Sequence, residues 1–155
     1  MRSHIHHLGL AAAAALAITA TPALAEVKNP TKDEAVDMVK KAVAHYKKVG
    51  KDKALADFSI KGGPFSAGEL YVFSSDLTGK VTSHGANAKL IGREQAPLKD
   101  ADGKLFVQEI LDKAKAGKTG WTDYKWANPV SKEIEQKTAY CEPLDGQVIC
   151  AGVYK

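Results

Sequence analysis

The sequence predicts an α+β domain built on an antiparallel sheet. An amphipathic helical pattern opens the chain after residue 30, a second helical pattern lies in its middle, and strand patterns fill much of the remainder. The last three strand patterns are joined by short connections, so these strands should be antiparallel neighbours. Helices confined to the start and middle of such a chain are typical of the α+β class.

The first 25 residues have the pattern of a secretory signal peptide. A short basic head precedes an apolar run, and an A-x-A motif ends at residue 25. The run is shorter than the roughly 20 residues that a membrane-spanning helix needs. We therefore expect residues 1–25 to be a signal peptide and residues 26–155 to form one domain, periplasmic or secreted. An uncleaved anchor is the alternative.

Charge and composition limit the partners of this domain. The formal net charge is +4, from 22 Lys and Arg against 18 Asp and Glu. The lysines are spread along the chain without forming a block, which argues only weakly for nucleic acid or a membrane surface. We therefore expect no nucleic-acid partner and no membrane span in the mature chain.

A long amphipathic helix is predicted at the start of the domain. Thr31 and Glu34 have the spacing of a capping box. Apolar residues then recur at helical spacing as far as Tyr46, and Gly50 occupies the place of a glycine that ends a helix. Residues 51–60 predict a second, shorter helix.

A pair of strands is predicted next. Residues 61–68, KGGPFSAG, break the helical pattern and predict a loop. ELYVFSSDLTGKVTSH then predicts a strand over 69–75, a turn over 76–79 and a second strand that ends near His84.

The middle of the chain combines a long connection with a helix. Residues 86–103 show only short regular pieces, and connections of this length are often functional. GKLFVQEILDKAKAG predicts a helix that ends before Gly117. We interpret the preceding DADG motif as the entry turn of this helix, with Asp102 near the N-cap. A calcium loop is the alternative, but only its first three positions match.

Three strands are predicted to close the domain, and the last two contain both cysteines. TGWTDYKWANP, EQKTAYCEPL and QVICAGVYK provide these strands. A two-residue turn at Asp145-Gly146 pairs Cys141 with Cys150 at a non-hydrogen-bonded position, where Cα atoms are about 4.5 Å apart. Export favours a disulfide between them. A redox-active pair or metal ligands are the alternatives, without support from a C-x-x-C spacing or a nearby histidine.

The ordered motifs resemble the single Cache domain in its type 2 pattern. They are LYVFSSDLTGKVTSHGANAKLIG, LKDADGKLFVQEILDKAKAG, GWTDYKWANP, KTAY and VICAGVY. The resemblance implies a PAS-like antiparallel sheet of five to six strands. It places the long N-terminal helix on one face. The middle helix and the long loop lie on the other face and enclose a small-ligand pocket.

The resemblance also implies a function in sensing. Related domains form the outer part of chemoreceptors or sensor kinases, whereas no transmembrane helix follows Tyr154 here. We therefore expect an exported stand-alone sensor or binding protein for a small metabolite. The alternative is a ligand-free interaction module that dimerises through the first helix or docks on a membrane sensor protein. Neither needs a cofactor or a metal. We expect no enzyme, since neither G-x-S-x-G nor H-E-x-x-H occurs.

The resemblance implies a carboxylate, an amino acid or a similar metabolite as ligand. Such a pocket should be apolar with a few placed polar groups. Tyr71 and Phe73 point to the same side of one strand, and the Tyr71 hydroxyl would need a partner when buried. His84 would make binding sensitive to pH near neutrality. Each of these residues has a plain packing role as its alternative.

Two cations and two further aromatic residues complete the candidates. Arg93 and Lys137 have the charge that an anionic ligand needs, although solvated side chains are the alternative for both. Trp126 precedes the proline-containing loop that borders the pocket in related domains, and Tyr140 lies on the same predicted strand as Lys137. The full set of candidate ligand-binding residues is Tyr71, Phe73, His84, Arg93, Trp126, Lys137 and Tyr140.

Overall fold

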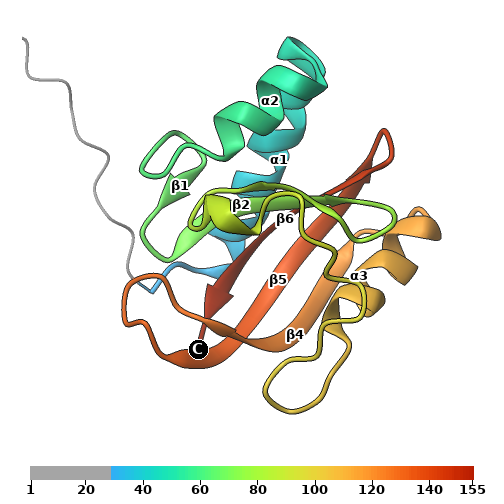
Figure 1. Cartoon of the computed structure of the whole chain (residues 1–155). Coiled ribbons are helices and arrows are strands. Elements are labelled where there is room, and N and C mark those ends of the chain that lie inside the picture. Colours follow the sequence, from blue (N-terminus) through green and yellow to red (C-terminus); the bar gives the residue numbers. More distant parts are fainter. Residues whose placement is uncertain (1–28) are drawn as a thin grey trace, which may run out of the picture.

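The structure, a computed structural model, describes residues 29–155 as an antiparallel sheet with helices on both faces (Figure 1). The predicted signal peptide lies outside these residues. The elements are α1 (Lys32–Val49), α2 (Lys51–Phe58), β1 (Ser66–Ala67), β2 (Leu70–Asp76), β3 (Val81–His84), the 3₁₀ helix η1 (Ala88–Leu90), α3 (Phe106–Lys115), β4 (Gly120–Ala127), β5 (Ile134–Leu144) and β6 (Gln147–Tyr154).

The sheet contains six strands: five follow the order β1-β2-β6-β5-β4, and β3 pairs with β2 beyond the short β1, on the side of β2 away from β6. All of these pairs are antiparallel, so β6 lies between its hairpin partner β5 and the earlier strand β2. The α+β prediction is confirmed. One detail differs, because the predicted loop over residues 61–68 contains the two-residue strand β1.

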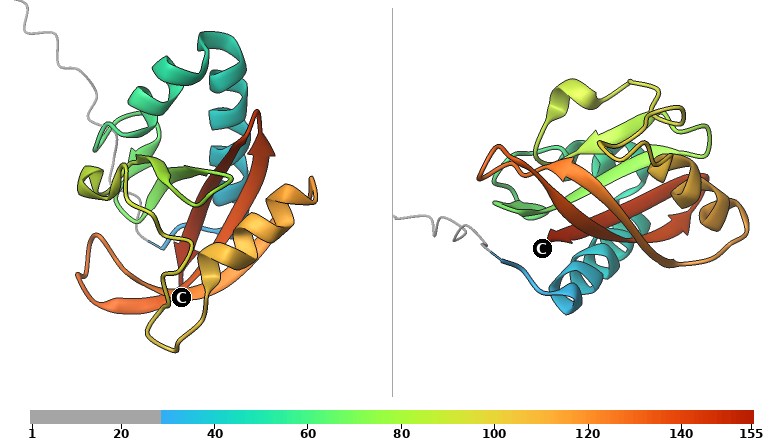
Figure 2. Two further views of the ribbon diagram at one scale, coloured as in Figure 1. Left: turned by 45° about the vertical axis from the view of Figure 1, so that its right-hand side comes forward. Right: turned by 90° about the horizontal axis from the view of Figure 1, so that it is seen from below.

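Helix α1 covers one face of the sheet, together with α2 (Figure 2). Its capping box is present, since the Thr31 side chain accepts from the Glu34 N–H and the Glu34 side chain accepts from the Thr31 N–H. Val39, Phe58 and Ile149 belong to the buried cluster between these helices and the sheet. No helix within residues 29–155 is both long and apolar enough to cross a bilayer.

Helix α3 and the long connection that begins at Ala86 lie on the other face (Figure 2). The predicted N-cap is corrected here: Leu105 is the N-cap of α3, and it makes no side-chain capping bond. Asp100 organises the entry turn instead, because its carboxylate accepts the backbone N–H groups of Asp102, Lys104 and Lys125. That carboxylate therefore fastens the connection to β4.

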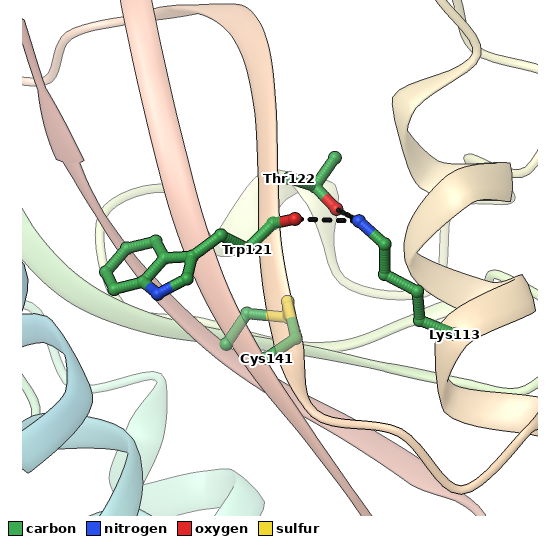
Figure 3. Close-up of a disulfide and its surroundings, with 5 residues drawn as sticks. Lys113, Trp121, Thr122 and Cys141 are labelled. Atoms are coloured by element: carbon green, nitrogen blue, oxygen red, sulfur yellow. Dashed lines mark hydrogen bonds between the residues drawn. A yellow bond between two sulfur atoms is a disulfide. The ribbon is translucent and has the colours of Figure 1, made fainter.

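The β5–β6 hairpin has the predicted register. Leu144 pairs with Gln147 and Cys141 pairs with Cys150, and a disulfide joins these two cysteines with a Cα–Cα distance of 4.1 Å. Figure 3 shows this disulfide beside Lys113 of α3, whose ammonium donates to the Trp121 carbonyl (2.7 Å) and to Thr122 Oγ1 (3.0 Å). The disulfide therefore links β5 to β6, and Lys113 links α3 to β4.

Candidate ligand-binding site

A small cavity lies between α3 and the sheet. Its volume is about 30 Å³, which is room for one or two water molecules. The cavity is narrower than a metabolite pocket, because the rings of Tyr71, Tyr124 and Phe106 occupy much of the space around it. The lining residues are Tyr71, Phe73, Ser74, Ser75, Val81, His84, Gln95, Phe106, Val107, Ile110, Tyr124, Trp126, Lys137, Val148 and Cys150.

Lys137 of β5 is the one lysine or arginine among these lining residues. Its side chain is only 1% exposed. Its ammonium donates to the Tyr71 hydroxyl at 2.7 Å and more weakly to the Tyr154 hydroxyl at 3.4 Å. An ammonium has three N–H donors, so one remains for a ligand. Burial lowers the pKa of Lys137 well below its usual range.

Aromatic rings, rather than carboxylates, surround this ammonium. The Nζ atom lies 4.1 Å from the ring centroid of Tyr71, 4.8 Å from that of Tyr154 and 5.1 Å from that of Phe73. No Asp or Glu lines the cavity in the described part of the chain. Cation–π contacts offset only part of the cost of burying a charge. The Lys137 amine therefore lacks an anionic partner that would favour its charged form.

Gly152 of β6 makes room for the stem of this lysine. A Cβ atom at residue 152 would lie 2.9 Å from Lys137 Cε and 2.6 Å from the Thr138 carbonyl oxygen. Both distances are too short for real side-chain contacts. A residue without a side chain is therefore required on the central strand for Lys137 to lie flat across the sheet.

His84 faces the same cavity as a neutral hydrogen-bond donor. Its Nδ1 accepts the backbone N–H groups of Asn87 (3.0 Å) and Ala86 (3.3 Å), so the proton of the neutral ring is on Nε2. Burial, followed by the charge of Lys137, lowers the pKa of His84 to about 3. This corrects the expectation of titration near neutral pH. The ring orders the chain after β3 while it lines the cavity.

The tyrosine hydroxyls form a short chain toward the end of β6. The Tyr71 and Tyr154 hydroxyls are 3.0 Å apart, and Tyr154 donates to the Ala127 carbonyl at 2.9 Å. Tyr154 therefore accepts from Tyr71, which in turn accepts from Lys137. Burial raises the pKa of both tyrosines, so both remain protonated.

The structure brings five of the seven candidate residues to the cavity and places two elsewhere. Tyr71, Phe73, His84, Trp126 and Lys137 line it. Their roles in binding stay predictions.

Arg93 and Tyr140 lie away from the cavity. The Arg93 side chain is exposed, and its Nε donates to the Lys89 carbonyl at 3.2 Å. Tyr140 points to the α1 face, where its ring is 5.5 Å from that of Trp121. Strand parity explains the second case, because Tyr140 is three residues from Lys137 and so points to the opposite face.

Two residues with clear roles at the site are absent from the predicted set. Tyr154 and Gly152 both contact Lys137 from β6. The hairpin register contains the signal for both, because the pairing of Cys141 with Cys150 also places Lys137 opposite Tyr154 and Ala139 opposite Gly152.

Parts of two larger proteins are similar to this chain. Over 86 residues it is 31% identical to the methyl-accepting chemotaxis protein McpP of Pseudomonas putida, a match that covers 54% of this chain and 16% of McpP. It is 33% identical over 86 residues to the sensor histidine kinase MctS of Rhizobium johnstonii, with 54% of this chain and 18% of MctS covered. The chain thus spans less than a fifth of either relative.

Solved structures share the fold at low sequence identity. A Cache chemosensory domain described for its carboxylic acid recognition gives a TM-score of 0.68 at 23% identity, over 79% of this chain and 91% of that domain. A methyl-accepting chemotaxis protein from Vibrio parahaemolyticus gives 0.67 at 20% identity, over 79% and 87%. The family model described as Single Cache domain 2 matches residues 23–154. The chain therefore belongs to the single Cache domain 2 family.

Proposed function

We propose that this domain binds a small monocarboxylate in the cavity beneath α3 and acts in extracytoplasmic sensing. The observation that carries the proposal is the buried ammonium of Lys137, which faces the cavity without a carboxylate partner. An isolated buried charge is costly. An anionic ligand would supply the missing charge.

The donors at the cavity suit a carboxylate group. Lys137 offers a free ammonium N–H, and His84 offers an Nε2–H that has no hydrogen-bond partner among residues 29–155. Hydrogen bonds between an ammonium and a carboxylate are among the strong ones in proteins. An anion beside Lys137 favours its charged form, so binding should draw a proton onto Lys137.

The remaining walls of the cavity favour a ligand with one negative charge and a short apolar tail. Phe106, Val107 and Ile110 of α3 form an apolar side. The α-ammonium of an amino acid would find no acidic partner in the described lining, and a second carboxylate would find no second lysine or arginine there. The small volume points the same way, because little beyond a carboxylate fits without side-chain movement.

The family of the domain and its disulfide agree with a function outside the cytoplasm. Cache domains are extracytoplasmic sensor modules that bind small ligands, and the Cys141–Cys150 disulfide fits an oxidising compartment. The carboxylic acid recognition reported for a structural neighbour supports the ligand class. We infer that the protein acts outside the cytoplasm as a sensor or binding protein.

Features of α1 favour ligand binding over the ligand-free docking alternative. Docking or dimerisation through α1 would be expected to leave an apolar stripe exposed on that helix. Among the described residues, the exposed large apolar side chains are Ile60, Ile91, Leu98, Leu105 and Ile134, all outside α1.

Titration calorimetry with acetate and propionate, and with glycine and succinate for comparison, tests the proposal. We expect saturable binding of a monocarboxylate to the wild type, no binding to Lys137→Met and unchanged binding to Arg93→Gln. Arg93→Gln is the matched control, because it removes a cation that lies outside the cavity. Equal affinity of the wild type and Lys137→Met for the monocarboxylate would refute the proposed site.

A further inference from the structure

A second, larger hollow lies directly outside the cavity. This outer hollow has a volume of about 280 Å³ and shares Tyr71, His84 and Trp126 with the inner cavity. These three side chains therefore form the wall between the two spaces. A ligand that reaches Lys137 from this side must pass them.

Two lysines line the outer hollow from separate loops. Lys61 belongs to the turn after α2, and Lys132 belongs to the loop between β4 and β5. Both also line an adjoining groove of about 460 Å³. No Asp or Glu of residues 29–155 lines either space. The approach to the inner cavity is thus flanked by positive charge.

The β4–β5 loop is built to hold Lys132 at this position. Asn128 is buried, and its Oδ1 accepts the backbone N–H groups of Val130 (2.9 Å) and Ser131 (3.4 Å). The Lys132 backbone N–H donates to the Asn128 carbonyl, and Lys132 has a φ of +69°, which a non-glycine residue seldom adopts. The Lys132 ammonium then donates to the Pro129 carbonyl, at the edge of the hollow.

Two carboxylates behind this loop, those of Glu69 and Glu135, are engaged with the protein. Asn128 Nδ2 donates to Glu69 at 3.0 Å and to Glu135 at 2.8 Å. Glu69 also accepts the Asn29 backbone N–H, and Glu135 accepts the Ser131 hydroxyl. Neither carboxylate lines the hollow, and both accept hydrogen bonds from neighbouring protein groups. Among the described residues that line the hollow, Lys61 and Lys132 are therefore the only ones with a full charge.

We propose that the outer hollow is an anion-collecting vestibule, in which Lys61 and Lys132 raise the local concentration of anions at the entrance to the inner cavity. Surface charges that line a concave path raise the rate at which oppositely charged ligands arrive. The identity of the final ligand rests on the proposed function, but the attraction of anions by the vestibule does not. Lys61 and Lys132 are thus positioning residues for association.

Quenching of Trp126 fluorescence tests the vestibule without any carboxylate. The chain has two tryptophans, and Trp121→Phe leaves only Trp126, which is half-buried and lines the hollow. In that background, iodide and neutral acrylamide are compared as quenchers at constant low ionic strength. We expect Lys61→Gln/Lys132→Gln to lower the iodide quenching constant by about two- to threefold and to leave the acrylamide constant unchanged.

The control variant removes two lysine charges at a site away from the hollow. Lys47→Gln/Lys48→Gln changes two exposed lysines of α1, across the sheet from the hollow, and should leave both constants unchanged. If the vestibule variant leaves the iodide constant unchanged, or changes the two constants in parallel, the inference is overturned.

Stopped-flow binding of propionate separates the vestibule from the inner site. The vestibule variant should associate more slowly by a similar factor, an effect that added salt removes, and it should dissociate at the wild-type rate. Lys137→Met should abolish propionate binding and keep the iodide quenching of the parent. Propionate binding that survives in Lys137→Met would contradict the proposed function, whereas the iodide result would still decide the vestibule. Slower dissociation or equal association in the vestibule variant would contradict the inference.

Discussion

The two faces of the sheet come from the same strands but serve different purposes. The face under α1 carries a dry cluster that includes Val39, Phe58 and Ile149, all fully buried. The face under α3 buries Lys137 and His84 beside a cavity. Alternation along each strand assigns neighbouring residues to opposite faces, so one face can be optimised for packing while the other accepts costly polar groups.

The largest expected effect comes from opening a void in the α1 face. Phe58→Ala removes a fully buried ring that packs on Phe65, with ring centroids 4.9 Å apart. We expect the free energy of unfolding to fall by about 3–5 kcal/mol, as for other buried Phe→Ala changes. Urea denaturation measures this loss. Ile60→Ala, at a residue that is 51% exposed, should cost less than about 0.5 kcal/mol. Comparable losses for both would contradict the role of this face.

Acidic pH should lower the free energy of unfolding because His84 is buried in its neutral form. Its pKa is about 3 in the folded protein against about 6.5 when unfolded. The unfolded chain therefore binds an extra proton between these values, and stability is lost as pH falls through this window.

We expect about 2–3 kcal/mol of this loss between pH 6.5 and 4.5, before most carboxylates titrate. Denaturation at several pH values measures it. His84→Asn can keep an acceptor for the Asn87 N–H while removing the titration, so its stability should vary less over the same range. An equal slope in both proteins would show that His84 is not responsible.

The disulfide should contribute a similar amount. Cys141→Ala/Cys150→Ala opens a link between residues nine apart in sequence, and loop entropy gives a loss of about 2–3 kcal/mol. Thermal unfolding of the oxidised wild type and the variant measures the difference. Reduction of the wild type should give a similar loss, and reduction of the variant should have no effect.

The smallest expected effect is a gain in stability from a change on the cavity face. Lys137→Met replaces a buried amine, whose pKa burial lowers, with an apolar side chain of similar length, and we expect the free energy of unfolding to rise by about 1–3 kcal/mol without ligand. The same variant should lose monocarboxylate binding. Denaturation and calorimetry on one preparation check both. A loss of stability would mean that the bond to Tyr71 outweighs the buried charge.

Local patterns were sufficient to predict much of the fold. The Thr31–Glu34 spacing located the start of α1, and the Asp145-Gly146 turn fixed the β5–β6 register together with the disulfide. In both cases a few neighbouring residues determine the geometry. The two-residue strand β1 was missed because its pairing with β2 arises from tertiary contact rather than from a strand pattern.

The site was less accessible to sequence reasoning because it depends on contacts between distant segments. The partners of Lys137 come from β2 and β6, and Tyr71 lies 66 residues away from it. Arg93 seemed suited to an anion by its charge, but its loop directs the side chain to solvent. The pKa of His84 likewise depends on burial and on Lys137 rather than on neighbouring residues in sequence.

Gly152 has a consequence for how this family member could diverge or be redesigned. An alanine at residue 152 would collide with the Lys137 stem and with the Thr138 carbonyl oxygen, so both the lysine and the paired backbone of β5 would have to shift. One methyl group on a residue that is absent from the cavity lining would thus displace Lys137, on which the proposed ligand preference rests. The position of the Lys137 amine therefore depends on the absence of a side chain at residue 152.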